Sequence, residues 1–200
     1  DQSYIINNQF SRYQGRVNID NQLSKALKAG VNMSLSYADN SALGAQSIYR
    51  NAIQKAPNIA IRDSSGKFNW LKGTNPTGPE NANNPVAEAT TGKNYSRDSR
   101  VLGNVYAELK LAPWLVLHSD FGTDWISTRS YSRIIDRPGM TGGTANESQQ
   151  QMIKWVVNNR IDVNKMINDD HSISAMIGQS FEKSVESVNA VTGTGFLNDD

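Results

Sequence analysis

The chain has 200 residues, and its 20 Lys and Arg almost balance its 19 Asp and Glu, giving a formal net charge of +1. This balance gives no electrostatic case for binding nucleic acid or an anionic bilayer surface, and the lack of cysteine excludes a disulfide framework and a cysteine-ligated metal. Only 38% of the residues are apolar, which suits a sheet that spends one face on apolar contact better than it suits a large closed core.

Two features of the sequence bear on membranes. No run of 18 or more apolar residues occurs, so we expect no transmembrane helix, although barrel strands give a much weaker signal. The chain opens with "DQSYIINNQF", which lacks the charged start of a secretory signal. We therefore expect either a processed protein or an internal piece of a longer one.

The first two predicted elements are strands at residues 12–20 and 27–37. The second, "LKAGVNMSLSY", alternates apolar odd positions with polar or tiny even positions without a break. Because successive side chains of a strand point to opposite faces, each strand has one apolar and one wet face. The short polar stretch between them predicts a hairpin.

A long loop is predicted at residues 38–98, rich in Asn, Ser, Gly and Pro. Structureless connections of this length are uncommon in compact domains and are usually functional. Within this loop "SIYRNAIQKA" has modest helical character, and "IAIRDSSGKFNW" resembles a small hairpin that turns at Ser65 and Gly66.

Four further strands follow the same alternation, separated by one more long loop at 127–148 and by short turns. They are predicted at 100–112, 115–125, 152–164 and 171–181. The tail "VESVNAVTGTGFLNDD" is predicted to be a loop, and its glycines lack the strand–helix context of a phosphate-binding loop. The fold class is therefore all-β, an antiparallel up-and-down meander of about six long strands.

Aromatic residues recur at the long-loop ends of these strands, all with the parity of the apolar face. They are Tyr13, Tyr37, Trp125, Trp155 and Phe181. Outward-facing aromatic girdles mark the interfaces of membrane barrels, and strands of about 9–11 residues cross a bilayer. The pattern favours a wall of a transmembrane β-barrel with long extracellular loops, but by itself leaves a soluble all-β carbohydrate-binding module open.

Several ordered stretches resemble the SusC/RagA family of TonB-linked outer-membrane transporters. They are "RYQGRVNIDNQLSKALKAGVNMSLSYADN", "KAPNIAIRDSSGKFNW", "NPVAEA", "RVLGNVYAELKLAPWLVLHSDFGTDW" and "WVVNNRIDVNKMINDDHSISAMIGQSFEKS". No single motif is diagnostic, whereas the ordered series is fairly specific and covers roughly residues 10–196.

This resemblance implies a fold and a set of partners. Such transporters have a 22-stranded barrel plugged by an N-terminal domain, import glycan fragments or peptides with a SusD-type lipoprotein, and draw energy from the TonB system. Six strands and no plug domain predict that residues 1–200 are a fragment of one barrel domain in the outer membrane, facing lipid on its apolar side.

Candidate catalytic groups are sparse. His118, Asp120 and Asp124 share the wet face of one predicted strand, and Glu108 lies on the facing strand, so these groups form either a cation site or a solvated lumen wall. The chain has no HExxH or G-x-S-x-G motif. We therefore expect no enzyme activity, no metal and no cofactor.

Aromatic residues in the predicted loops are the weak candidates for substrate contact. Tyr49, Trp70, Tyr95 and Tyr131 have Asn-rich surroundings, and aromatic platforms beside amides suit carbohydrate. Charged residues of the wet face could guide a polar substrate or form cross-strand charge pairs.

Overall fold

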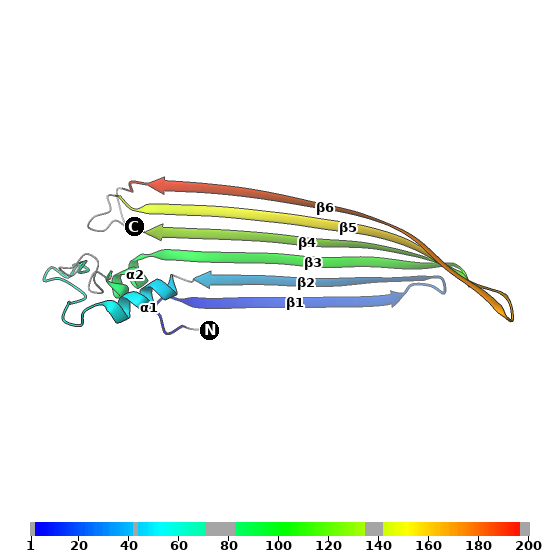
Figure 1. Cartoon of the computed structure of the whole chain (residues 1–200), viewed down its shortest axis with the longest axis horizontal. Coiled ribbons are helices and arrows are strands. Elements are labelled where there is room, and N and C mark those ends of the chain that lie inside the picture. Colours follow the sequence, from blue (N-terminus) through cyan, green and yellow to red (C-terminus); the bar gives the residue numbers. More distant parts are fainter. Residues whose placement is uncertain (1–2, 42–43, 71–82, 135–141, 197–200) are drawn as a thin grey trace.

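The fold of the described residues is a single antiparallel sheet with a small helical layer at one end (Figure 1). The computed structural model describes residues 3–41, 44–70, 83–134 and 142–196. The strands are β1 (Gln9–Gln22), β2 (Leu27–Ser41), β3 (Lys93–Ala112), β4 (Leu115–Ile134), β5 (Thr144–Asn168) and β6 (His171–Thr194). The helices are α1 (Ala45–Gln54) and α2 (Pro85–Thr91).

The sheet follows chain order, so every strand pairs with its sequence neighbour and the predicted meander is confirmed. Short turns join β1 to β2, β3 to β4 and β5 to β6 at one end of the sheet, which we call the turn end. The longer connections and both helices lie at the opposite end, which we call the loop end.

At the turn end the predicted strand boundaries lie within four residues of the observed ones, the largest error being the end of β5 at Asn168, whereas at the loop end they are wrong by up to thirteen residues. β2 and β4 begin at Leu27 and Leu115, as predicted, but β4 continues to Ile134 and β6 to Thr194. The predicted loop 127–148 and the predicted tail loop are therefore largely strand. Their side chains are mostly polar, and the few apolar ones, such as Ile134, Val188 and Val191, keep no strict period of two, so the alternation stops while backbone pairing continues.

The predicted loop 38–98 also contains more structure than the sequence indicated. It includes the end of β2, the start of β3, α2, and the helix and hairpin that the sequence did predict. The hairpin pairs Arg62 with Phe68 and turns at Gly66, whose φ of +81° is readily adopted by glycine. Residues 42–43 and 71–82 of this loop and 135–141 of the second loop lie outside the described residues.

The odd-numbered face of the sheet is apolar and uncovered in the described parts of the chain. Val105 is 50% exposed and Ile177 is 71% exposed, and Leu117 is half-buried. No described helix or second sheet packs on this face, as a soluble sandwich would require. Among the residues that the structure describes, the buried hydrophobic cluster consists of Ile5, Ile48 and Ala89 and lies instead in the helical layer.

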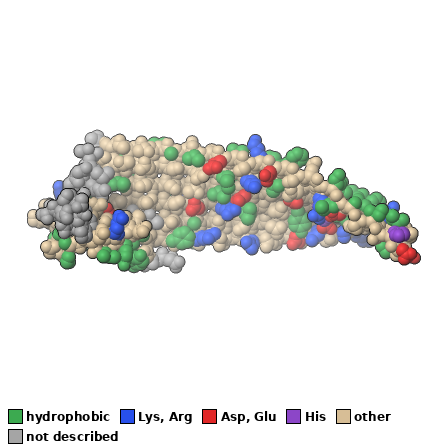
Figure 2. Space-filling view, viewed as in Figure 1, with side chains coloured by type: hydrophobic (Ala, Val, Ile, Leu, Met, Phe, Trp, Pro, Cys, Tyr) green, Lys and Arg blue, Asp and Glu red, His purple; other side chains and the backbone are tan. Residues whose placement is uncertain are grey.

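Charges of both signs are interspersed over the face shown in Figure 2, and hydrophobic side chains gather where the β5–β6 hairpin projects beyond the other strands. Among the described residues, no helix is long and apolar enough to span a membrane.

Candidate functional site

The five girdle aromatics lie on the odd-numbered face, each at a similar distance from the turn end. Tyr37 is ten residues from Leu27, Trp125 ten from Leu115, and Phe181 ten from His171. Tyr13 is nine residues from the end of β1 and Trp155 thirteen from the end of β5. Four of the five rings therefore lie at nearly the same height above the short turns, and Trp155 lies three to four residues higher on the longer β5.

This line of aromatics runs obliquely across the backbone pairing. Tyr13 is directly opposite Tyr37, and Tyr37 is in turn opposite Ser99 on β3. Trp125 is opposite Val101, which lies two residues nearer the turn end than Ser99. A steady displacement of this kind results when strands are tilted to a common plane, as barrel strands are. At a rise of about 3.3 Å per residue and a tilt near 45°, ten residues span roughly 23 Å, close to the ~25 Å apolar band of membrane barrels.

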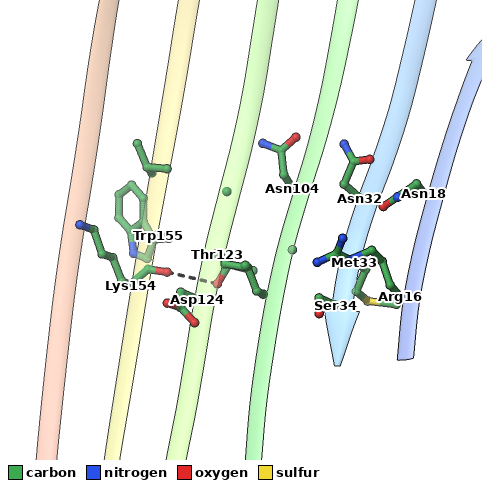
Figure 3. Close-up of a pocket in the computed structure, with 14 residues that line it drawn as sticks. Arg16, Asn18, Asn32, Met33, Ser34, Asn104, Thr123, Asp124, Lys154 and Trp155 are labelled. Carbon is green, nitrogen blue, oxygen red and sulfur yellow. Dashed lines mark hydrogen bonds between the residues drawn. The ribbon is translucent and has the colours of Figure 1, made fainter. Parts of the chain in front are cut away.

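The even-numbered face is polar and hollowed. A cavity of about 560 Å³ lies over the middle of the sheet, and ten of its fourteen lining residues are even-numbered. Figure 3 shows its side chains arising from β1 through β5. Asn18, Asn32 and Asn104 are directly opposite one another on β1, β2 and β3, and Gly122 extends the row on β4.

Charged groups beside this hollow are mostly paired. Arg100 holds Asp124 with two hydrogen bonds, Nε to Oδ1 at 2.9 Å and Nη2 to Oδ2 at 2.7 Å. Lys154 lies 3.7 Å from Glu182. The even-numbered face thus carries amides and matched charges, but the accessible lining of its cavity is mostly apolar and includes Leu102 and Val156.

The four groups weighed as either a cation site or a solvated wall, His118, Asp120, Asp124 and Glu108, do not converge in the structure. His118 lies between two carboxylates, with Nε2 3.0 Å from Asp162 and Nδ1 3.7 Å from Glu108. Asp120 instead accepts a hydrogen bond from Asn158, and Asp124 is held by Arg100. Within the described ranges no group of three acidic or histidine residues is placed to hold a metal ion.

Three of the four aromatics predicted in loops lie in a helix or a strand, which corrects the sequence-based expectation. Tyr95 and Tyr131 lie on β3 and β4, directly opposite each other, with rings stacked at a centroid distance of 5.3 Å. Their odd numbering puts them on the apolar side of the wall, beyond the girdle. Tyr49 lies on α1 in edge contact with Tyr4.

Trp70 is the fourth candidate, and it lines a second cavity of about 230 Å³. This cavity lies between the helical layer and the loop ends of β3 and β4, where Asn94 is directly opposite Ser132. The even numbers of Asn94 and Ser132 place them on the polar face. Trp70 is therefore the one candidate that the structure brings to polar groups of the wall.

Asn84 fastens the segment that ends in Trp70 to the helical layer. Its Oδ1 accepts from the backbone N–H groups of Val86 and Ala87, which caps α2, and it is only 2% exposed. Its Nδ2 donates to the carbonyls of Ile61 and Asn69 on the small hairpin, at 2.8 and 3.0 Å. Sequence reasoning missed this role, although Asn followed by Pro85 at the first helical position is a known helix-start signal.

The hairpin itself is held by an acidic turn residue. Asp63 Oδ1 accepts hydrogen bonds from the Ser65 hydroxyl at 2.7 Å and from the Ser65 and Lys67 backbone N–H groups. Chiefly because the Ser65 hydroxyl donates to the ionised form, the pKa of Asp63 lies below its ordinary value.

Known proteins with similar sequences are TonB-dependent receptors. The chain is 26% identical over 195 residues to TonB-dependent receptor P26 of Formosa agariphila, a match that covers 94% of this chain and 19% of the relative. It is 24% identical over 178 residues to TonB-dependent receptor P39 of the same species, covering 87% of this chain and 16% of that relative. The chain thus spans less than a fifth of these curated relatives, and no family model matches it.

Solved structures with a similar fold include RagAB importers. The chain superposes on the RagAB peptide importer in its "closed-closed" state with a TM-score of 0.73 at 18% identity, covering 96% of this chain and 22% of that one. For the "open-open" state the TM-score is 0.72 at 20% identity, with the same coverage. The predicted resemblance to SusC/RagA-type TonB-dependent transporters is confirmed by these likenesses in sequence and fold.

Proposed function

We propose that this chain forms part of the wall of a TonB-dependent importer in the bacterial outer membrane. The observation that carries the proposal is the uncovered apolar band on a single curved sheet, bounded by the five aromatics. Monomeric soluble proteins rarely expose contiguous apolar patches larger than a few hundred Å². In the bilayer the same band faces lipid, and Tyr13, Tyr37, Trp125, Trp155 and Phe181 form the interface girdle.

In this proposal the even-numbered face lines the lumen, and the mechanism is binding and translocation without covalent chemistry. The helical layer and loop ends then shape the extracellular entrance, where a SusD-type lipoprotein covers the barrel. The TonB system supplies energy through a plug domain elsewhere in the transporter. The cargo is a glycan fragment or a peptide, and the structural likeness to the RagAB peptide importer supports the peptide option.

The proposed outer-membrane location is tested by expressing the intact gene product that contains this chain in a Gram-negative host. We expect it in the outer-membrane fraction, with faster gel migration before boiling than after, because a closed barrel resists detergent. Recovery of the described fold as a monodisperse, detergent-free soluble protein would contradict the proposal. That outcome would instead support the soluble carbohydrate-binding module.

Transport is tested by growth of the same strain on peptone or on hydrolysed polysaccharide as the limiting nutrient. Growth on one of these sources is expected to require both the gene product and TonB. Equal growth after deletion of either component, on both sources, would exclude energised import of these cargoes.

A further inference from the structure

The cavity beside Trp70 has the size of a subsite for one ring. Its volume of about 230 Å³ is below the roughly 300–1,000 Å³ of pockets that hold a drug-sized ligand. Its walls come from α1, α2, and the loop ends of β3 and β4. On the proposed orientation it opens on the lumen side of the entrance, where passing cargo meets the wall.

The charged groups around this cavity are already engaged. Glu88 accepts from Asn51 at 2.8 Å through Oε2 and from Asn83 at 2.7 Å through Oε1. The Arg133 guanidinium lies 5.5 Å from the centre of the Phe196 ring. A charged ligand would have to displace these contacts, so the cavity favours a neutral one.

Two hydroxyls of the lining are also committed as donors. Ser47 Oγ donates to the Gly44 carbonyl at 2.7 Å, and Thr91 Oγ1 donates to the Ala87 carbonyl at 2.6 Å. Their oxygens still have lone pairs that can accept from a ligand hydroxyl. The cavity therefore contains acceptors for O–H donors.

Asn94 and Ser132 supply the remaining polar groups. Their side chains have no hydrogen-bond partner among the described residues, and they lie directly opposite each other on β3 and β4. A carboxamide both donates and accepts, and so does a hydroxyl. The cavity therefore combines the half-buried aromatic ring of Trp70 with two side chains, Asn94 and Ser132, that can bind hydroxyl groups.

The geometry points to a subsite for one neutral sugar ring of an imported glycan. The apolar face of the ring lies on Trp70, and its hydroxyls bond to Asn94 and Ser132. This inference rests on the proposed importer for the route of the glycan, and it selects a neutral glycan over a peptide. A peptide side chain in the cavity would leave most of these donors and acceptors without a hydrogen-bond partner, which costs binding free energy. The hydroxyls of a sugar ring would pair with them instead.

The test uses the intact gene product, purified in detergent micelles, on an array that displays neutral glycans, acidic glycans and short peptides. The strongest neutral glycan is then titrated against the wild type and variants. Trp70→Ala is expected to weaken binding about ten-fold or more, and Asn94→Ala about three- to ten-fold. Trp70→Phe keeps an aromatic ring and is expected to retain most of the affinity.

Trp114→Ala is the matched control, because it also removes an indole but lies in the turn between β3 and β4, at the opposite end of the sheet. Binding unchanged by Trp70→Ala, or binding restricted to peptides or acidic glycans, would overturn the subsite. So would an absence of binding to every neutral glycan by protein whose gel mobility shows an assembled barrel.

Failure of the subsite is distinguishable from failure of the importer. TonB-dependent growth that survives Trp70→Ala, without neutral glycan binding, would leave the importer intact and remove the subsite. Conversely, Trp70-dependent glycan binding by a protein absent from the outer membrane would keep the subsite and exclude the importer.

Discussion

The sheet has two regions that share one hydrogen-bonded ladder but differ in their side chains. Below the girdle, towards the turn end, odd positions such as Val31 and Val105 are apolar and even positions such as Asn32 and Asn104 are polar. Beyond the girdle both faces are mostly polar, with isolated exceptions such as Tyr131 and Val191, although the pairing of β4 with β5 continues without a shift to Ile134 and Thr144. Backbone hydrogen bonding thus determines how far the strands extend. The alternation of apolar and polar side chains instead indicates whether each face contacts an apolar or a polar environment.

The two regions are also stabilised differently. Beyond the girdle, cross-strand polar pairs occur on both faces, including Thr128 to Asp98 at 2.7 Å and Thr192 to Asn146 at 2.8 Å at even positions and the Arg129–Glu147 ion pair at odd positions. Below the girdle, cross-strand ion pairs such as Arg100–Asp124 lie on the even-numbered face. Pairs of this kind contribute roughly 0.2–1 kcal/mol each. Below the girdle the proposed stabilisation is apolar contact with lipid on one face, so changes there should have larger effects.

The largest effect is expected from a charge placed on the apolar band. Val31→Arg should destabilise the assembled protein by about 2–4 kcal/mol, because an arginine would face hydrocarbon. Asn32→Arg, on the opposite face, and Gln149→Arg, on the odd face beyond the girdle, should each change stability by less than about 1 kcal/mol. The difference is measured by the yield of protein in the outer membrane and by denaturant unfolding in detergent. Equal stability of all three variants would contradict the proposed difference between the two regions.

A second test addresses packing on the polar face below the girdle. Tyr106 lies across Gly30 and donates a hydrogen bond to Asp20, so a Cβ on Gly30 would come within 2.7 Å of the Tyr106 ring. Gly30→Val should cost about 1–3 kcal/mol of unfolding free energy through overpacking. Gly15→Val is the control, since nothing lies within 4 Å of the added Cβ. Equal melting temperatures of the Gly30→Val and Gly15→Val proteins would show that the close approach of Tyr106 to Gly30 does not limit stability.

The helical layer should respond to Asn84→Ala independently of both sheet regions. The change removes the cap of α2 and both bonds to the hairpin, at an expected local cost of about 1–2 kcal/mol. Hydrogen exchange should quicken at residues 85–91 but not in the strands below the girdle. Asn84→Asp keeps the cap and loses the two donors, so it should have an intermediate effect; unchanged exchange in both variants would contradict the role of Asn84.

The smallest effect is expected for the ion pair beyond the girdle. Arg129 and Glu147 are exposed, so a double-mutant cycle of Arg129→Ala and Glu147→Ala should give a coupling of roughly 0.2–1 kcal/mol. That coupling should shrink in 1 M salt, where the Debye length is about 3 Å. A coupling above about 2 kcal/mol would show that this region is more rigid and less hydrated than proposed.

Much of the fold was predictable wherever alternation was strong. The positions of the short turns, the starts of β2, β4 and β6, and the sheet order follow from period-two patterns and turn residues. The hairpin at Gly66 and the helix at α1 were also predictable, because their signals are local. The girdle assignment stays a prediction, since its geometry agrees with a membrane interface without testing one.

The loop ends of the strands were not predictable from alternation. Residues 127–134 and 144–151 are mostly polar at odd and even positions alike, so no hydrophobic period marks them as strand. Tyr95 and Tyr131 were therefore misassigned to loops. The cavity of Trp70 was also beyond sequence reasoning, because it depends on how residues far apart in the chain are brought together by Asn84 and the two helices.

The sequence by itself determined the strand type, the apolar parity, the turn end and the resemblance to TonB-linked transporters, because these depend on local patterns and ordered stretches. Only the tertiary structure decided how far the strands extend, and that Trp70 lies near Asn94 and Ser132. Backbone hydrogen bonds between neighbouring strands continue whatever the side chains are, and a cavity exists only where separate segments pack together. Both properties belong to the paired and folded chain, so no window of the sequence encodes them alone.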